Sequence, residues 1–445
     1  MKINLSKIAD FLSLDINGDD AYINNLVIDS RKVSKGDLFV AIPGQRYDGH
    51  TFINKSIEFG ASAVLCEKSR KLSGLPVPYI ICNDTVESLG IIAHKYRKYI
   101  GSPFTIGITG TNGKTSVTKL TAEILSQSYS ISTTIGNYNN QIGLPLSILQ
   151  IASSEEPQKC IYELGASKKN DISTLVNICE PDMTTLLNIS EAHMESFGSI
   201  NNLIQTKEEI FSHPNTSHVI LNADDKNYDR WKNLNKGRKI TTLSLNDRAD
   251  YYIKSNDNDS YTFSSNKGEI RIRKEEVLGI LPINILFSMA LSMEAGASIN
   301  DVKNGIKSYK GVKGRFFHYV SSAGSIIIDD SYNANPESMK SSLKQLKQFN
   351  QDKIFVMGDM GELGESSLEH HIAIFKLARE YKIKYLFYMG RYEDEAKSSF
   401  GDRCFVYKEI KELTDHVRKL SSKNTVILIK ASRYMNFDLI VKGLK

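Results

Sequence analysis

A glycine-rich segment near residue 110 contains the residues best suited to phosphate chemistry. It reads Thr109-Gly110-Thr111-Asn112-Gly113-Lys114-Thr115-Ser116, and it lies between an apolar run, 104–109, and a segment rich in helix formers, 116–127. Backbone N–H groups of such a turn can surround phosphate oxygens, and the following helix N-terminus adds a positive dipole end. Lys114 would neutralise the outer phosphates, and the Thr115 hydroxyl would bind Mg²⁺. We therefore predict an ATP-binding loop.

This predicted loop departs from the strict phosphate-loop pattern at one position. The pattern has a glycine five residues before Gly113, where this chain has Ile108, with Gly107 and Gly110 on either side. The alternative is a glycine-rich turn with a chance lysine. The order of strand, glycines, Gly-Lys-Thr and helix favours the phosphate loop.

Further candidate residues follow predicted strands. Glu163 lies near the end of the apolar run 160–164, and His193 follows the run 183–189. Later runs are followed in the same way by Asp330, Asp359 and Lys430 to Arg433. Ligands of open α/β sheets bind outside the carboxyl ends of the strands, so we expect these residues to share one crevice. The Glu163 carboxylate suits Mg²⁺ directly, whereas His193, considered alone, is more often an ordinary hydrogen-bonded histidine.

The composition is that of a globular protein. The 445 residues are 41% hydrophobic and 24% charged, with a net charge of +5. The charges are scattered rather than gathered in a basic stripe, which argues against a nucleic-acid partner. The five cysteines form no CxxC pair, and residues 1–14 lack the apolar run of a signal peptide. No apolar run approaches the roughly 18 residues of a membrane span. We expect a cytoplasmic monomer without a membrane span.

The order of elements predicts an α/β protein of three domains. Short apolar runs alternate with helical patterns, which favours largely parallel sheets. At roughly 150 residues each, three domains fit the length. Glycine-containing linkers place the domains at 1–100, 101–313 and 314–445. The central one would be a phosphate-loop domain with a parallel sheet, and the last would be Rossmann-like. The polar stretch 255–267 is typical of exposed hairpins.

The segment Thr109 to Thr115 resembles the ATP loop of the Mur ligases and of their relative folylpolyglutamate synthase, and the similarity extends over nearly the whole chain. The resemblance implies that ATP phosphorylates a carboxylate and that an amine then attacks the acyl phosphate. It implies catalytic roles for Lys114, Glu163, His193 and Lys207. Of these, Glu163, His193 and Lys207 would join Thr115 as metal ligands, with Lys207 acting as a carbamate. It adds Asn284, Arg315 and Asp330 to the ATP site.

Other motifs resemble the Mur ligase branch that adds D-alanyl-D-alanine to a UDP-N-acetylmuramoyl tripeptide. They are the loop 136–145, the string 329–339, the glycine-rich segment 358–364 and the end segment 430–433. The N-terminal stretches 28–41 and 44–50 resemble the domain that binds the uridine nucleotide. The resemblance implies a substrate-binding set made of Ser30, Arg31, Gln45, Arg46, Asn137, Asn140, Asn333, Asn335, Lys430 and Arg433. The domains 1–100 and 314–445 would then bind the UDP substrate and the acceptor.

Two positions depart from the family pattern and leave alternatives open. Ile283 and Phe287 stand where polar residues are usual, although Asn284 between them is present, so the adenine contacts are unassigned. One alternative is a Mur-type ligase with another amine acceptor, although the Asp-Asn-Pro-Arg motif of the diaminopimelate-adding branch is absent. The other is a catalytically silent protein that binds a nucleotide sugar. Intact Lys114, Glu163 and His193 oppose it.

Overall fold

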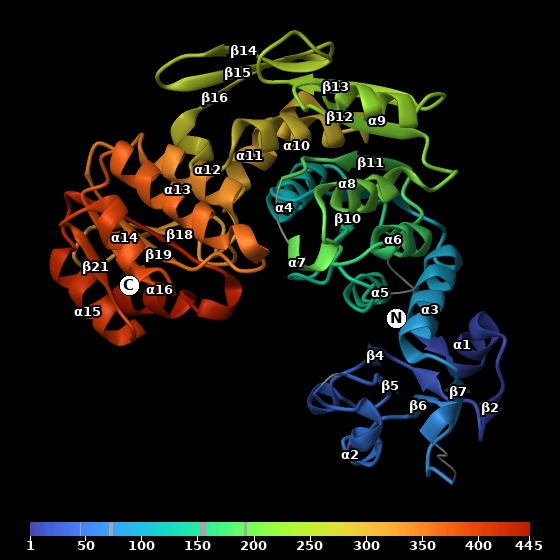
Figure 1. The fold of residues 1–445 in the computed structure, drawn as a ribbon. Coiled ribbons are helices and arrows are strands. Elements are labelled where there is room, and N and C mark those ends of the chain that lie inside the picture. The colour runs from blue at the N-terminus through green and yellow to red at the C-terminus, as the bar shows by residue number, and fades with distance from the viewer. Residues whose placement is uncertain (45, 71–73, 152–156, 191–193) are drawn as a thin grey trace.

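The computed structural model describes residues 1–44, 46–70, 74–151, 157–190 and 194–445. Three α/β units follow one another along an arc (Figure 1): an N-terminal unit in blue, a central unit in green to yellow, and a C-terminal unit in orange to red. Each unit contains its own main sheet. The predicted α/β class is confirmed. Among the described residues, no helix is both long and apolar enough to cross a membrane.

The N-terminal unit contains a five-stranded sheet in the order β2-β7-β6-β5-β4. The β2–β7 pair is antiparallel and the other three pairs are parallel. The strands are β2 (Ile16–Asn17), β4 (Leu26–Val27), β5 (Leu38–Val40), β6 (Ala63–Glu67) and β7 (Tyr79–Cys82), and β1 (Ile3–Asn4) pairs with β3 (Tyr22–Ile23). The helices are α1 (Leu5–Leu12), α2 (Ile53–Glu58) and α3 (Thr85–Tyr99).

The central unit is built on a nine-stranded sheet in the order β16-β15-β14-β13-β12-β11-β8-β10-β9. It is parallel from β9 to β14 and antiparallel in the β14–β15–β16 extension. The strands are β8 (Phe104–Thr109), β9 (Ile131–Thr133), β10 (Lys159–Glu163), β11 (Met183–Leu186), β12 (His218–Asn222), β13 (Lys239–Ser244), β14 (Tyr251–Asn256), β15 (Ser260–Ser265) and β16 (Gly268–Arg273). The helices are α4 (Lys114–Leu125), α5 (Gly143–Leu149), α6 (Asp171–Cys179), α7 (Met194–Phe197), α8 (Ile200–Glu208), α9 (Tyr228–Leu234), α10 (Pro282–Glu294) and α11 (Ile299–Ser308).

The C-terminal unit has a six-stranded sheet in the order β17-β18-β22-β19-β20-β21, with an antiparallel β17 at one edge. The strands are β17 (Phe317–Val320), β18 (Ile326–Asp329), β19 (Asp352–Gly358), β20 (Tyr385–Met389), β21 (Cys404–Val406) and β22 (Thr425–Lys430). The helices are α12 (Pro336–Leu346), α13 (Ser367–Glu380), α14 (Glu393–Phe400), α15 (Ile410–Leu420) and α16 (Asp438–Leu444). All residues of β22 are buried, as expected for an inner parallel strand covered on both faces.

The apolar runs predicted most of the inner strands, and one of them is shorter than expected. The strand predicted over 104–109 is β8, and the predicted hairpins over 255–267 are β14 to β16. The run 183–189 leaves the sheet after Leu186, because its later residues bond the phosphate loop instead. Asn188 accepts a backbone hydrogen bond from Thr111 at 3.0 Å.

A buried arginine ties the N-terminal unit to the central one. Helix α3 packs against α5 and α6, so one apolar core extends through both units. Near the end of α3, the Arg97 guanidinium donates to the Pro103 carbonyl at 3.2 Å and to the Glu180 carboxylate at 3.4 Å. Because these contacts satisfy a buried cation, the linker after α3 is fixed in place.

Candidate active site

The predicted phosphate loop connects β8 to α4, at the carboxyl end of an inner strand. Gly113 has a φ of +88°, and a Cβ added there would lie 2.9 Å from the Asn284 side-chain oxygen, so both conformation and space favour glycine. The Lys114 ammonium donates to the carbonyls of Gly110 and Thr111 at 2.9 and 3.1 Å. Burial lowers the pKa of Lys114, and the nearby Glu163 charge opposes that shift.

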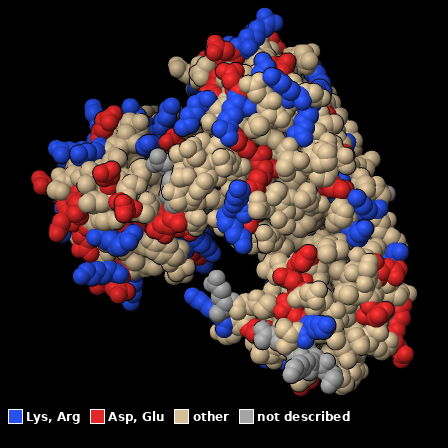
Figure 2. Space-filling model, turned by 45° about the vertical axis from the view of Figure 1, so that its right-hand side comes forward, with Lys and Arg blue, Asp and Glu red and all other residues tan. Residues whose placement is uncertain are grey.

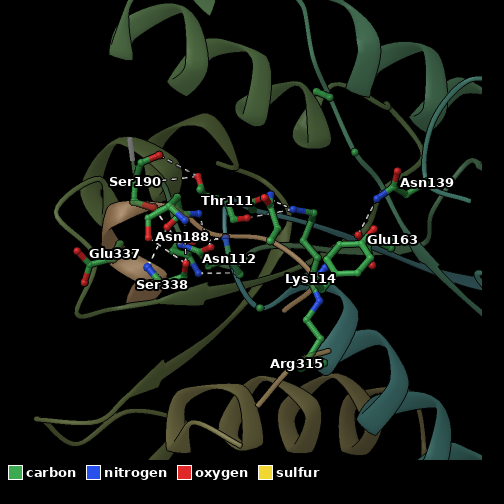
Figure 3. A pocket seen from close by; sticks show the side chains of 18 of the residues that line it. Thr111, Asn112, Lys114, Asn139, Glu163, Asn188, Ser190, Arg315, Glu337 and Ser338 are labelled. Atoms are coloured by element: carbon green, nitrogen blue, oxygen red, sulfur yellow. Dashed lines mark hydrogen bonds between the residues drawn. The ribbon is translucent and has the colours of Figure 1, made fainter. Parts of the chain in front are cut away.

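A second loop, which contains Asn188 and Ser190, forms hydrogen bonds with the phosphate loop. The Asn188 side chain accepts a hydrogen bond from the Asn112 backbone N–H and donates to the Asn112 carbonyl, both at 2.9 Å. Ser190 accepts from the Asn112 side-chain amide at 3.1 Å (Figure 3). Sequence reasoning missed Asn188 and Ser190. Their one signal was their position directly after a strand next to β8.

Glu163 lies at the end of β10, with 3% of its surface exposed. The Asn139 amide donates to one of its carboxylate oxygens at 2.7 Å (Figure 3). The Thr115 hydroxyl donates to the other oxygen, also at 2.7 Å. No ion pair to Glu163 is formed among the described parts of the chain. The carboxylate is therefore oriented by neutral hydrogen-bond donors.

Lys207 is buried, although its helical context suggested a surface lysine. It lies near the end of α8 and is 3% exposed, and it lines the same cleft as Lys114 and Glu163. Burial, followed by the positive charge of Lys114, lowers the pKa of Lys207 to about 7. A large fraction of this side chain is thus a neutral amine near neutral pH, which is the form that can react with carbon dioxide.

These residues line a cleft of about 1280 Å³ that reaches all three units. Figure 2 shows an open hollow between the N-terminal and C-terminal units, with Lys and Arg at its margins. The cleft lining includes Pro43 and Val86 of the N-terminal unit, the phosphate loop of the central unit, and Gln345 of the C-terminal unit. Its charged lining consists of Lys114, Lys168, Lys207, Lys226, Arg315 and Lys430 against Glu163, Asp171, Asp330 and Glu337. Six cations against four carboxylates favour anionic ligands.

Two residues predicted to bind different ligands are bonded to each other. The buried Lys430 ammonium donates to the Asp330 carboxylate at 2.6 Å and to the Asn333 carbonyl at 3.0 Å. Asp330 also accepts from the Phe316 backbone and from Ser342. Both side chains line the cleft, but their first role in the structure is to link β18, β22 and α12. Their ligand roles stay predictions.

Arg315 reaches from the C-terminal unit toward the phosphate loop. Its guanidinium lies 3.4 Å from the Thr115 hydroxyl, and it stacks over the Tyr332 ring at 4.1 Å from the centroid. Asn284, on α10, also lines the cleft. Phe287 is buried in the central core and Ile283 packs at its edge, so the two apolar departures serve packing of α10.

A smaller pocket of about 370 Å³ lies in the C-terminal unit beside the cleft. Its lining residues are Asn333, Ala334, Asn335, Gly361, Glu362, Ser432, Arg433 and Tyr434. Asn333 and Asn335 line the cleft as well, so the two spaces are neighbours. The Arg433 side chain is 62% exposed and lies 3.7 Å from Asp438, a weak pairing that leaves its charge accessible.

The remaining predicted substrate residues are spread more widely. Asn140 lines the cleft, and its side chain also accepts at 2.8 Å from the backbone of Gly143, the first residue of α5. Asn137 is exposed outside the cleft lining, and its neighbour Asn139 holds Glu163 instead. The structure does not bring Ser30, Arg31 and Arg46 to the cleft lining, and Arg31 pairs with Asp29 at 2.8 Å. Gln45 and His193 lie outside the described residues.

A phosphate loop, a buried carboxylate and a cationic cleft together define a nucleotide-binding α/β protein. Residues 108–290 match the Mur ligase middle domain, residues 314–433 match the Mur ligase glutamate ligase domain, and residues 22–97 match the Mur ligase family catalytic domain. The chain belongs to the Mur ligase family.

The similar proteins point to one branch of this family. UDP-N-acetylmuramoyl-tripeptide–D-alanyl-D-alanine ligase of Buchnera aphidicola from Acyrthosiphon pisum is 34% identical, over 100% of this chain and 98% of the relative. The enzyme of that name from Escherichia coli K12 is 30% identical, over 100% and 99%. MurF ligase of Thermotoga maritima, solved with ADP, is 27% identical with a TM-score of 0.81, over 95% of this chain and 97% of that one. MurF of Acinetobacter baumannii, at 24% identity, shares the fold with a TM-score of 0.90, over 100% and 99%.

Proposed function

We propose that this protein is an ATP-dependent ligase that joins D-alanyl-D-alanine to UDP-N-acetylmuramoyl tripeptide, a MurF-type step in peptidoglycan precursor synthesis. The main support is the single cleft in which Lys114 and Glu163 face surfaces of both flanking units. Three ligands must meet in such a reaction, and a cleft between three units can bring them together. The relatives that match over the full chain carry this activity in their names.

The reaction has two balanced steps. The terminal carboxylate of the tripeptide attacks the γ-phosphorus of ATP, so that an acyl phosphate forms and ADP leaves. The dipeptide amine then attacks the acyl carbon, phosphate leaves with the bonding electron pair, and the amine loses a proton. Lys114 and Arg315 supply positive charge beside the phosphate loop, where the transition state of the first step gains negative charge.

The residues around Glu163 fit a Mg²⁺ ion. Its carboxylate and the Thr115 hydroxyl offer hard oxygen ligands within one hydrogen bond of each other, and the carboxylate forms no direct ion pair with the described residues. A bound Mg²⁺ ion would neutralise phosphate charge there. We assign His193 and carbamylated Lys207 as further ligands by family resemblance, and the lowered pKa of Lys207 supports the carbamate.

The remaining assignments are part of the same proposal. The domains 1–100, 101–313 and 314–445 would bind the UDP substrate, ATP and the acceptor. Ser30, Arg31, Gln45 and Arg46 are assigned to the UDP substrate. The smaller pocket would bind the dipeptide, with the accessible Arg433 holding its carboxylate by charge-assisted hydrogen bonds. We propose that the protein acts as a monomer in the cytoplasm.

An acceptor-dependence assay tests the proposal. Phosphate release from ATP is measured with UDP-N-acetylmuramoyl tripeptide and, in turn, D-alanyl-D-alanine, free D-alanine and diaminopimelate. We expect turnover with the dipeptide and much poorer turnover with the single amino acids. Equal use of a single amino acid would mean another acceptor class, and no acceptor-dependent release would mean a silent relative.

A further inference from the structure

Two asparagine side chains join the phosphate loop to the C-terminal unit. The Asn335 amide donates to the Asn112 side-chain oxygen at 2.8 Å, and the Asn112 amide donates to the Asn335 side-chain oxygen at 3.4 Å. The two residues are 223 positions apart in the chain. Asn112 lies in the loop between β8 and α4, beside Ser338 at the start of α12 (Figure 3). We call this contact the asparagine pair.

Each side chain of the asparagine pair is also fixed within its own unit. Asn188 holds the Asn112 backbone on both sides, and Ser190 accepts from the Asn112 amide. On the other side, the Asn335 oxygen caps α12 by accepting from the Ser338 backbone N–H at 2.8 Å. Because both amides have fixed orientations, a shift of the Asn112 side chain must either break the pair or move Asn335 with it.

The asparagine pair also connects the two spaces. Asn335 lines both the cleft and the smaller pocket. Asn112 lines the cleft and not the smaller pocket. Among the described residues, two other hydrogen bonds that involve a side chain join the central and C-terminal units: Arg315 to Thr115 at 3.4 Å, and the Gly364 backbone to Glu195 at 3.3 Å. The pair contains the shortest of these hydrogen bonds, and it lies closest to the smaller pocket.

We propose that Asn112 is a positioning residue for the amine acceptor, acting through Asn335. The pair holds the smaller pocket against the phosphate loop, so that an amine bound there is presented to the carboxylate activated at the loop. This inference rests on the proposed function. The proposal gives Asn112 a role different from that of the glycines and Lys114 of the same loop, which are predicted to bind phosphate.

The test is an Asn112→Ser variant, which removes the pair and keeps the backbone contacts of Asn188. We expect the KM for D-alanyl-D-alanine to rise about five- to tenfold, the effect of about one lost hydrogen bond, and the KM for ATP to change less than about twofold. Asn233→Ser is the matched control, because it makes the same change at an exposed position on α9, outside the lining of both spaces. It should leave the dipeptide KM within about twofold of the unmodified protein.

A double-mutant cycle with Asn335→Ser completes the test, because serine retains a good helix cap but is too short to reach Asn112. If the pair acts as one unit, adding Asn112→Ser to Asn335→Ser raises the dipeptide KM by less than about twofold. An Asn112→Ser variant with an unchanged dipeptide KM, or with an equal rise in the KM for ATP, would overturn the inference. The proposed function fails differently, since the unmodified protein would then show no dipeptide-dependent turnover.

Discussion

Glu163 is buried and Glu294 is half-buried, with 8% of its side chain exposed, and these two carboxylates of the central unit differ in the charge of their partners. Glu163 accepts hydrogen bonds from Thr115 and Asn139, which are neutral. Glu294, at the end of α10, accepts from Lys239 at 2.5 Å and from Tyr251 at 2.8 Å, and pairs with Lys267 at 3.1 Å. Burial alone would raise the pKa of Glu294, but hydrogen bonds from Lys239, Tyr251 and Lys267 lower it to about 2.

This difference separates a carboxylate that serves function from one that serves stability. The lysines already neutralise Glu294, which therefore fastens α10 to β13 and to the β14–β16 extension. Glu163 forms no direct ion pair with the described residues, although the Lys114 charge lies nearby, so its oxygens remain open to a cation brought by the ligands. Burial alone would not have distinguished the two residues. The charge of their partners does.

The largest expected difference between variants of Glu163 and Glu294 is in catalytic activity. Glu163→Gln removes one negative charge while keeping the shape of the side chain, and we expect the rate of acceptor-dependent phosphate release to fall by about 100-fold or more. Glu294→Gln makes the same chemical change far from the cleft, and its rate should stay within about threefold of the unmodified protein. Similar losses in the two variants would remove the distinction.

Replacing Lys207 should cause an intermediate loss of activity that added small carboxylates partly restore. Lys207→Ala removes the proposed carbamate, so we expect activity to fall at least about tenfold and to recover in part when acetate or formate is added. The exposed Lys232, changed to alanine, is the control and should show neither loss nor rescue. Full activity of Lys207→Ala would exclude a catalytic role, and a loss without rescue would argue against the carbamate.

Replacing the two glutamates should affect the free energy of unfolding in the reverse order, with the larger effect at Glu294. Because the folded pKa of Glu294 is about 2, below the ordinary 4.5, its stabilisation is fully present above pH 4.5 and is lost as the pH falls toward 2. Its lysine partners are 62% and 42% exposed, which limits the effect. We expect Glu294→Gln to lower the free energy of unfolding by about 1–2 kcal/mol at pH 7.

Denaturant unfolding at pH 7, 4 and 3 measures this effect. The gap between Glu294→Gln and the unmodified protein should narrow as the pH falls through this window. Glu163→Gln should change the free energy of unfolding by less than about 1 kcal/mol at pH 7, because Asn139 can still donate to the amide oxygen and the Thr115 hydroxyl can turn to accept from the amide NH2 group. A larger destabilisation by Glu163→Gln would mean that its role is structural.

The sequence predicted the inner strands well because buried parallel strands are continuous apolar runs. It also placed Lys114 and Glu163 after strands, where both line the cleft. Contacts between distant segments were not predictable in this way. Asn139, Asn188 and Ser190 act by bonding residues far away in the chain, and no local pattern encodes such a partner.

The sequence also did not predict which charged side chains are buried or which of them form ion pairs. A helical pattern gave Lys207 a surface position, and only the family resemblance assigned it to the site. Asp330 and Lys430 were expected to bind different ligands, but these residues, 100 positions apart, form a buried ion pair. Tertiary packing decides such cases, because the same short motif is compatible with a ligand or with a protein partner.

Equilibrium binding of a metal ion tests the central claim about Glu163 most directly. Mn²⁺ can replace Mg²⁺ at oxygen ligands, and its binding in the presence of ADP can be followed by electron paramagnetic resonance. We predict that Glu163→Gln weakens Mn²⁺ binding by about tenfold or more, while Glu294→Gln leaves it unchanged. Equal Mn²⁺ affinity in Glu163→Gln and in the unmodified protein would contradict the account.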